Sequence, residues 1–337
     1  MRAPAFWSRS LPFWLAPLLR PLGAIYGALT LRRMARPGWR ASVPAISVGN
    51  FTAGGAGKTP TALALAQDLI ARGERPAFVS RGYGGSMSGP HRVNPTQDSA
   101  WITGDEPLLL ARIAPTYVAR DRAAGGRRAI ADGATCLILD DALQNPALTK
   151  DLSVAVVDGA AGFGNGEVIP AGPLRAPFDA QLPFVDLVLV IGEDRSDITA
   201  RADGRKPVLS ARIVPEGEHL AGRDVIAFCG IALPEKFQRS LEACGARVIE
   251  RIDFADHHAF TDVEAESLLA RVARSGAQLV TTEKDHVRLA GSPMLEKLAT
   301  ESLALPIRLV ADEALFEAVH RALGASRSRR SAASGPE

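Results

Sequence analysis

The chain has 337 residues, of which 47% are hydrophobic and 23% charged, and its formal net charge is +2. This composition is typical of an α/β protein and excludes a largely disordered chain or one built from many membrane spans. The small net charge argues against a dedicated nucleic-acid binder, so no nucleic acid is expected as a partner. The three cysteines, Cys136, Cys229 and Cys244, form no CxxC pair, which predicts core side chains in a reducing compartment rather than disulfides or a zinc site.

Residues 1–40 combine aromatic and basic side chains with no acidic residue. A secretory signal needs one clean apolar run, and a membrane span needs about 20 apolar residues, but Arg20 and several prolines interrupt this segment. We therefore expect a helix or helix pair lying in the membrane interface, where aromatic rings and arginines are favoured. A helix packed on the protein's own core and a single span remain alternatives. The aromatic residues concerned are Phe6, Trp7, Phe13, Trp14 and Tyr26.

From about residue 43, short β-branched runs alternate with helical stretches. Strands are predicted at 45–48, 77–80, 117–119, 136–139, 154–157 and 187–191, with a helix at 60–72 that Gly73 ends. This alternation predicts parallel strands with crossover helices in a layered α/β sheet. A second set predicts a smaller C-terminal α/β lobe, with strands at 225–228, 247–249 and 278–281 and helices at 234–244 and 262–275.

The most informative stretch is the glycine-rich loop between the first strand and the first of these helices. Glycines let backbone N–H groups turn toward phosphates, Lys58 can reach the β and γ oxygens, and the Thr59 hydroxyl can take a Mg²⁺ position. The strict P-loop pattern fails only where Thr52 replaces the first glycine. The strand–loop–helix context nevertheless predicts a nucleotide-binding P-loop. Its expected ATP-binding residues are Thr52, Gly54, Gly55, Ala56, Gly57, Lys58, Thr59 and Pro60.

A nucleotide site also needs an acidic group for its metal ion at the end of a neighbouring strand. The apolar run 136–139 ends in Asp140 and Asp141. Two adjacent carboxylates repel each other unless a cation lies between them, so a Mg²⁺ site formed with Thr59 is predicted. A surface turn that begins with two aspartates is the alternative.

Three further groups are candidates for catalysis or support. Asp105, in Gly-Asp-Glu-Pro, is a candidate carboxylate beside an acceptor hydroxyl, although acidic residues there also cap a helix. His257 follows Asp256, a pair that can act as a base and its orienting group or simply form a polar loop. Arg81 lies on a glycine loop at a strand end, well suited to phosphate charge.

Nine short motifs occur in a characteristic order. They are Gly-Gly-x-Gly-Lys-Thr-Pro (54–60), Ser-Arg-Gly-Tyr-Gly (80–84), Gly-Asp-Glu-Pro (104–107), Asp-Asp-x-Leu-Gln (140–144), Gly-Phe-Gly-Asn-Gly (162–166), Pro-Ala-Gly-Pro-Leu-Arg (170–175), Ala-Phe-x-Gly-Ile-Ala (227–232), Phe-x-Asp-His (254–257) and Thr-Thr-Glu-Lys-Asp (281–285). Over residues 43–290 this order resembles the tetraacyldisaccharide 4'-kinase family, the lipid A 4'-kinases of Gram-negative bacteria.

The resemblance implies transfer of the ATP γ-phosphate to the 4'-hydroxyl of a tetraacylated glucosamine disaccharide 1-phosphate, with Mg²⁺. It implies peripheral or monotopic attachment to the cytoplasmic face of the inner membrane through the N-terminal helix. It also implies that Asp105 is the general base, with His257 its partner across two lobes. The motif register favours His257 over His258. Glu106, Arg81, Arg175, Gln144 and Asp256 are expected as supporting residues.

The chain departs from the family pattern at three positions. Ala142 stands where the family usually has glycine, Asn145 where it has histidine, and Ala176 where it has glutamate. The domain organisation expected is a membrane-interface helical segment at 1–40, a P-loop kinase core at 41–215, the smaller lobe at 216–323 and a disordered tail at 324–337.

Two other classes of protein have similar loops. A regulatory or metallochaperone-type P-loop NTPase would carry a signature lysine where this chain has Ala53. A membrane-recruited nucleotide-binding scaffold would not need Asp105 or the Asp256–His257 pair. Hydrolysis of ATP without a lipid acceptor would favour the first alternative, and nucleotide binding without turnover the second.

Overall fold

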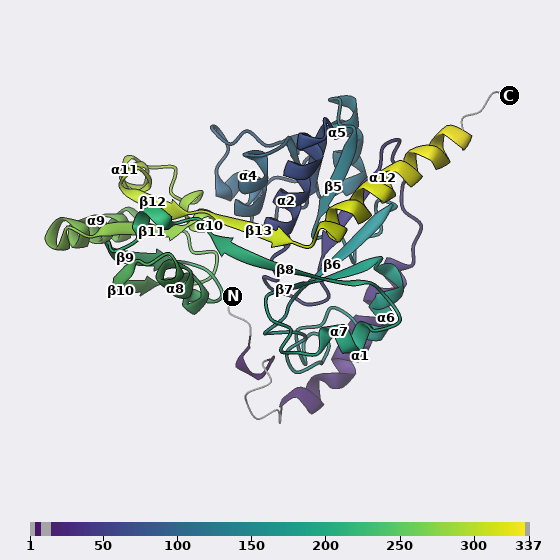
Figure 1. Cartoon of the computed structure of the whole chain (residues 1–337), viewed down its shortest axis with the longest axis horizontal. Helices are drawn as coiled ribbons and strands as arrows, with labels where there is room; N and C mark the ends of the chain where they lie inside the picture. Colours follow the sequence, from purple (N-terminus) through teal and green to yellow (C-terminus); the bar gives the residue numbers. More distant parts are fainter. Residues whose placement is uncertain (1–3, 8–14, 334–337) are drawn as a thin grey trace.

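The computed structural model describes residues 4–7 and 15–333, and Figure 1 shows two lobes of unequal size. The larger lobe is built on a nine-stranded sheet and the smaller on a four-stranded one, counted over the described residues. Both are layered α/β units, as the alternation of strand and helix patterns predicts.

The large sheet has the strand order β13-β8-β7-β6-β1-β5-β2-β4-β3. Neighbouring strands are parallel from β8 to β4, while the edge strands β13 and β3 are antiparallel to their neighbours. The strands of this sheet are β1 (Ala45–Gly49), β2 (Pro76–Ser80), β3 (His91–Arg92), β4 (Thr116–Val118), β5 (Cys136–Asp140), β6 (Leu152–Asp158), β7 (Leu187–Ile191), β8 (Val208–Pro215) and β13 (Ile307–Ala311).

Both faces of this sheet are covered, so β1, β2, β5 and β7 are buried along their whole length. Ile46 and Val48 of β1 pack in the cluster that contains α2, α4 and α12. Leu137 and Leu139 of β5 point to the opposite face. The helices of the large lobe are α1 (Leu15–Met34), α2 (Lys58–Ala71), α3 (Ala100–Thr103), α4 (Asp105–Ala111), α5 (Arg122–Ala131), α6 (Phe178–Gln181), α7 (Ile198–Ala202) and α12 (Glu313–Ala333), with 3-10 turns η1 (Ala5–Trp7) and η2 (Leu182–Phe184).

The small lobe carries a parallel sheet in the order β10-β9-β11-β12. Its strands are β9 (Asp224–Cys229), β10 (Arg247–Asp253), β11 (Gln278–Thr282) and β12 (Ser302–Leu305); its helices are α8 (Pro234–Ala243), α9 (Asp262–Ser275), α10 (Glu283–His286) and α11 (Pro293–Glu301), with the 3-10 turn η3 (Glu218–Leu220). The predicted helix 262–275 is confirmed residue for residue, because Thr261 and Glu264 form a capping box at its start and Gly276 ends it.

The C-terminal part of the predicted organisation is wrong in two respects. The smaller lobe does not extend to residue 323, because β13 returns to the large sheet beside β8. The tail was expected to be disordered from 324, yet α12 continues to Ala333; residues 334–337 lie outside the described residues. The helix is held down by ion pairs that composition does not reveal: Arg327 with Glu74, and Arg329 and Arg330 with the buried carboxylate of Asp151.

The N-terminal helix α1 packs on the large lobe through small side chains. A Cβ atom at Gly23 would lie 2.9 Å from the carbonyl oxygen of Val168, and one at Gly27 would lie 3.2 Å from Pro177. Among the described residues, no helix is long and apolar enough to cross a membrane. Of the aromatic residues named for this segment, Phe13 and Trp14 lie outside the described residues.

Candidate functional site

Several of the predicted site residues follow neighbouring strands of the large sheet. The glycine loop follows β1, Asp141 follows β5 directly, and Arg81 follows β2. These three strands lie in the order β1-β5-β2 and run parallel, so their carboxyl ends meet at one edge. Ligands of open α/β sheets bind at this edge.

The glycine loop joins β1 to α2 as predicted. Gly54 and Gly57 have φ of 113° and 90°, values that side chains with a Cβ atom rarely adopt. Helix α2 begins at Lys58, so the N–H groups of Lys58 and Thr59 have no helical partner, whereas Pro60 has no N–H and the N–H of Thr61 donates to the carbonyl oxygen of Gly57. Lys58 Nζ donates to the carbonyl oxygen of Gly54 at 3.2 Å, which folds the side chain over the loop. A glycine loop with a lysine at a helix N-terminus is an arrangement that suits an anion.

Arg175, in the loop between β6 and α6, holds the glycine loop in place. Arg175 donates to the carbonyl oxygen of Thr52 at 3.2 Å, to Gln144 Oε1 at 3.2 Å and to Asp141 Oδ2 at 2.8 Å. Gln144 in turn donates to the carbonyl oxygen of Asn50 at 2.7 Å. Arg175 and Gln144 therefore lie where sequence analysis expected support, and their contacts connect the phosphate loop to the aspartate pair.

Asp140 is buried and Asp141 half-buried, and Lys58 Nζ lies 3.8 Å from Asp141 Oδ1. Among the described residues, Oδ1 of Asp140 and Oδ1 of Asp141 have no hydrogen-bond partner. Burial, Glu106 and Asp141 raise the pKa of Asp140 to about 7. Burial opposes ionisation of Asp141 as well, but Lys58 and Arg175 lower its pKa to about 2. Unpaired buried carboxylate oxygens are what a hard divalent cation binds.

The donor set therefore suits Mg²⁺ bound together with a nucleotide. The described residues bring together no group of three or more His, Cys, Asp and Glu side chains that could hold a metal alone. Magnesium usually takes one or two carboxylates and completes its shell with phosphate oxygens and waters. Asp140, Asp141 and the Thr59 hydroxyl can supply the protein's share.

Two residues that sequence analysis did not single out fix this pair. Ser80 Oγ donates to Asp140 Oδ2 at 2.9 Å. The buried Arg122 donates to the carbonyl oxygens of Asp140 and Asp141, at 2.8 and 3.0 Å. Asp141 itself has a φ of 46°, a conformation that costs about 1–3 kcal/mol outside glycine and persists where neighbours enforce it.

The second group of predicted residues meets between the lobes. Asp105, the first residue of α4, is 4% exposed. Its Oδ2 atom lies 2.9 Å from Nδ1 of His257, which comes from the small-lobe loop after β10. Because a carboxylate only accepts, the Nδ1 atom carries the hydrogen. His257 has a φ of 57°, and its backbone N–H donates to the carbonyl oxygen of Gly230.

Asp105 is held ionised by its surroundings. Burial raises the pKa of this carboxyl, but the hydrogen bond from His257 and the cations Lys284 and Arg288 together bring it well below its usual range. Lys284 Nζ lies 3.4 Å from Nε2 of His257 and 3.3 Å from Oε1 of Glu106. A lysine only donates, so it faces the lone pair of Nε2.

Of the remaining predicted residues, Asp256 lies beside this contact. Asp256 Oδ1 lies 3.9 Å from His257 Nε2. Arg81 is exposed, and its charge acts on Arg122. His258 pairs with Glu264 of α9 instead, at 3.0 Å, so the structure brings His257 and not His258 to Asp105. Tyr83, from the same motif as Arg81, lies with its ring 5.9 Å from the ring of His257.

The three residues that depart from the family pattern are accommodated by packing or by hydrogen bonds. Ala142 is buried in the cluster beneath β5, Asn145 Oδ1 accepts from the N–H of Ala147, and the carbonyl oxygen of Ala176 accepts from Gln181. Cys136 and Cys229 are buried and Cys244 is half-buried, so the predicted packing role is confirmed for the first two.

Sequence reasoning assigned no role to Ser80, Arg122, Lys284, Asp285 or Arg288. Ser80, Lys284 and Asp285 stand inside motifs used for the resemblance, so their motif membership was a usable signal. Arg122 and Arg288 stand outside these motifs, and only the fold brings them to the aspartates.

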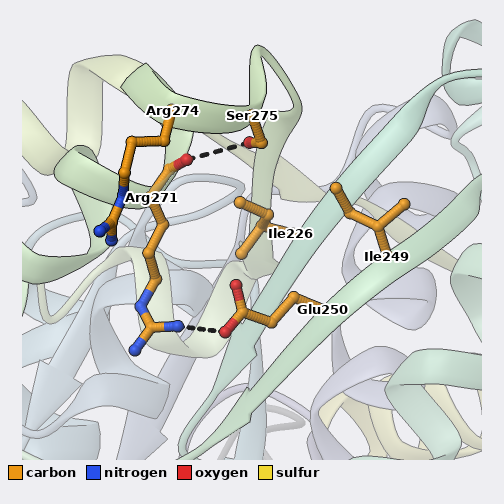
Figure 2. A pocket seen from close by; sticks show the side chains of 6 residues that line it. All are labelled: Ile226, Ile249, Glu250, Arg271, Arg274 and Ser275. Carbon is orange, nitrogen blue, oxygen red and sulfur yellow. Dashed lines mark hydrogen bonds and ion pairs between the residues drawn. The ribbon is translucent and has the colours of Figure 1, made fainter.

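A separate hollow of about 340 Å³ lies on the small lobe (Figure 2). Its lining comes from β9, β10 and α9, and the Arg271 guanidinium there is already paired with Glu250. It is not continuous with the sheet edge described above. The residues that line it are Ile226, Ile249, Glu250, Arg271, Arg274 and Ser275.

Comparison with known proteins places this geometry in context. The family model described as tetraacyldisaccharide-1-P 4'-kinase matches residues 15–324. A curated tetraacyldisaccharide 4'-kinase of Methylobacterium sp. (strain 4-46) is 52% identical over 92% of this chain and 93% of its own length. One of Methylobacterium nodulans is also 52% identical, over 96% of this chain and 97% of its own length. One of Rhodospirillum centenum is 49% identical over 93% of this chain and 94% of its own length.

Among solved structures, one described as the "apo" form of LpxK from Aquifex aeolicus in complex with ATP matches with a TM-score of 0.73. It is 24% identical in sequence, and the match covers 92% of this chain and 99% of that chain. The likeness confirms the expected fold over nearly the whole molecule.

Proposed function

Because the chain belongs to the tetraacyldisaccharide-1-P 4'-kinase family, we propose that it transfers the γ-phosphate of ATP to the 4'-hydroxyl of a tetraacyldisaccharide 1-phosphate. The observation that carries the proposal at residue level is the contact of Asp105 with His257 across the lobes. A P-loop NTPase that only hydrolyses ATP would not need such a pair. The predicted kinase class therefore agrees with both the family and the geometry.

The nucleotide end of the site is the glycine loop. The N–H groups at the start of α2 and the Lys58 ammonium bind the phosphates. Mg²⁺ held by Thr59, Asp140 and Asp141 would neutralise charge on the β and γ oxygens. Arg175 donates to Asp141 and to the carbonyl oxygen of Thr52, which fixes the position of Asp141 relative to the glycine loop.

The acceptor end is the lobe contact. The 4'-oxygen forms a bond to the γ-phosphorus while the bond from that phosphorus to the β–γ bridging oxygen breaks, and ADP leaves with the electron pair. The hydroxyl proton needs an acceptor. Asp105 was expected to be that base, but its lowered pKa and its buried contacts with His257 and Arg288 make it a weak one.

We assign proton acceptance to Nε2 of His257 instead, with Asp105 orienting the ring. The Nδ1 hydrogen points to Asp105, which leaves the lone pair on Nε2. Lys284, which faces this lone pair and also contacts Glu106, must move off it before the acceptor hydroxyl can donate there. His257 is also more accessible than Asp105, with side chains 33% and 5% exposed. This division of labour matches the general logic of a base held in one tautomer by a buried carboxylate.

The acceptor is a lipid, and the outer surface of α1 suits an anionic membrane. Four large apolar side chains at helical spacing, each at least 56% exposed, form a stripe on this helix, and basic residues flank it. The stripe consists of Leu18, Leu22, Ile25 and Leu29, with Tyr26 beside it. We propose attachment to the cytoplasmic face of the inner membrane through this stripe; flotation with vesicles tests it.

The direct test of the function is a transfer assay with radiolabelled ATP and a tetraacyldisaccharide 1-phosphate in mixed micelles. Label is expected in the lipid only when both substrates are present. Release of labelled inorganic phosphate at the same rate with and without the disaccharide would point to a regulatory or metallochaperone-type NTPase.

A further inference from the structure

The guanidinium of Arg288 is buried where the two lobes meet. Arg288 follows α10 in the small lobe, and its side chain is 5% exposed. Its Nε atom donates to Asp105 Oδ2 of the large lobe at 3.0 Å, and Nη2 contacts the same oxygen. One cation thus touches the same carboxylate oxygen that accepts from His257.

The small lobe holds this guanidinium in place independently of Asp105. Nη1 donates to Asp285 Oδ1 at 2.6 Å and to the carbonyl oxygen of Gly230 at 3.0 Å. Asp285 is fully buried and also accepts from the Thr282 hydroxyl at 2.6 Å. Gly230 also accepts from the backbone N–H of His257. Arg288 and His257 are therefore anchored to one small-lobe frame.

We propose that Arg288 is a positioning residue for phosphate transfer: anchored by Asp285 and Gly230, it keeps Asp105 ionised and aimed at His257 only when the lobes are together. The inference rests on the proposed function. Its physical basis is that a buried carboxylate is costly to ionise unless a cation is in contact with it. A planar guanidinium can satisfy Asp105 and Asp285 at once, which an ammonium cannot do with the same geometry.

The charged groups around Asp105 and His257 determine how a substitution of Arg288 affects the ionisation of Asp105. Asp105 is faced from the small lobe by His257, Lys284 and Arg288, and Glu106 follows it on α4. His257 is faced by Asp105, Asp256 and Lys284, and Arg288 Nη2 lies 3.4 Å from its Nδ1. Without Arg288, the described contacts that still oppose the protonation of Asp105 are those with His257, with the backbone N–H of Glu106 and with the more distant Lys284.

The experiment compares Arg288→Met with Arg288→Lys in the full-length protein. For Arg288→Met we expect kcat to fall about 10²-fold, as for misplaced catalytic groups, with little change in KM for ATP. The acidic limb of the pH profile of kcat should move upward by about 1 pH unit, because Arg288 contacts both Asp105 and the ring of His257 and removing this cation favours protonation of the pair. Arg288→Lys keeps the positive charge and should leave the limb in place, but it should recover kcat only in part, because an ammonium cannot reproduce the contacts of the guanidinium with both Asp105 and Asp285. Arg288→Gln is the second neutral variant should the methionine fail to fold.

The matched control is Lys236→Met. Lys236 of α8 pairs with Asp158 at the end of β6, so this variant also removes an ion pair between the lobes, but one that does not involve Asp105. In Lys236→Met the acidic limb of the pH profile of kcat should stay at the same pH as in the wild-type protein. If both variants lower kcat equally and neither shifts the limb, Arg288 merely fastens the lobes and the inference is wrong.

A readout without substrate separates this inference from the proposed function. The ¹⁵N chemical shifts of the His257 ring report its hydrogen bond to Asp105, and they should change in Arg288→Met but not in Lys236→Met. Unchanged shifts in Arg288→Met would overturn the inference even in an active kinase. Absence of transfer by the wild type, with the shifts changing as expected, would overturn the proposed function alone.

Discussion

Nδ1 of His257 lies 2.9 Å from Oδ2 of Asp105, although the two residues are 152 positions apart in the sequence. The contact joins the first residue of α4 in the large lobe to a loop of the small lobe. Because its two halves come from different lobes, any separation of the lobes would break this contact.

Asp105→Asn should abolish most transfer to the lipid acceptor, with kcat reduced about 10³-fold or more, because the ring of His257 loses its orienting charge. The affinity for ATP, measured by calorimetry, should change less than threefold. A parallel loss of ATP affinity would place Asp105 on the metal ion instead.

His257→Gln and His258→Gln form a matched pair of adjacent substitutions. The first should lower kcat by about 10²–10⁴-fold, the range for general acid–base groups. The second breaks the pair with Glu264 at the capped start of α9, so it should lower the melting temperature with kcat near the wild-type value. Equal kcat in the two variants would refute the assignment of His257 as the group that accepts the hydroxyl proton.

Asp140→Asn should stabilise the protein without nucleotide at pH 8. Burial and the neighbouring carboxylates raise the pKa of Asp140 to about 7, so the ionised form is disfavoured in the folded state. That cost is absent below the unfolded-state pKa and grows as pH rises toward 7. A gain of roughly 2–4 °C in melting temperature at pH 8, vanishing below about pH 4, is expected. The variant should also lose the stabilisation by Mg²⁺ with ATP; retention of it would contradict the metal site.

Asp151→Asn tests why the C-terminal helix is ordered. Burial opposes ionisation of Asp151, but the Ala45 N–H, Ser326 and Arg330 lower its pKa. Its contribution to stability is present above the unfolded-state pKa and is lost as pH falls through the lower folded-state pKa. We expect a loss of about 2–3 kcal/mol at pH 7, smaller than for a fully buried pair, measured by urea unfolding. An unchanged midpoint at pH 7 would show that the ion pairs with Asp151 do not contribute to the anchoring of α12.

Leu22→Glu with Ile25→Glu and Leu29→Glu should release the protein from anionic vesicles in a flotation assay, because it charges the exposed stripe of α1. The control is Val263→Glu, on the small lobe, where the side chain is 76% exposed. Equal flotation of the triple variant and the control would rule out α1 as the attachment surface.

Local signals predicted the elements well, and the glycine loop with Asp140 and Asp141 followed from motif and strand order alone. The meeting of Asp105 with His257 followed from the resemblance, since no local pattern joins residues so far apart. The helical structure of the C-terminal end of α12 was not predicted, because a Ser- and Arg-rich composition is typical of disordered segments. The carboxylates that pair with its arginines, Glu74 and Asp151, lie far away in the sequence. Arg288 was missed for the same reason: a single arginine shows its role only when burial and Asp105 surround it.

The most direct test of the account is to identify the product. Wild-type protein, ATP and a tetraacyldisaccharide 1-phosphate should yield a lipid whose second phosphate is on the 4'-oxygen, as determined by ³¹P–¹H correlation NMR, and His257→Gln should yield little of it. A product phosphorylated at another position, or ADP formed without a phosphorylated lipid, would contradict the account.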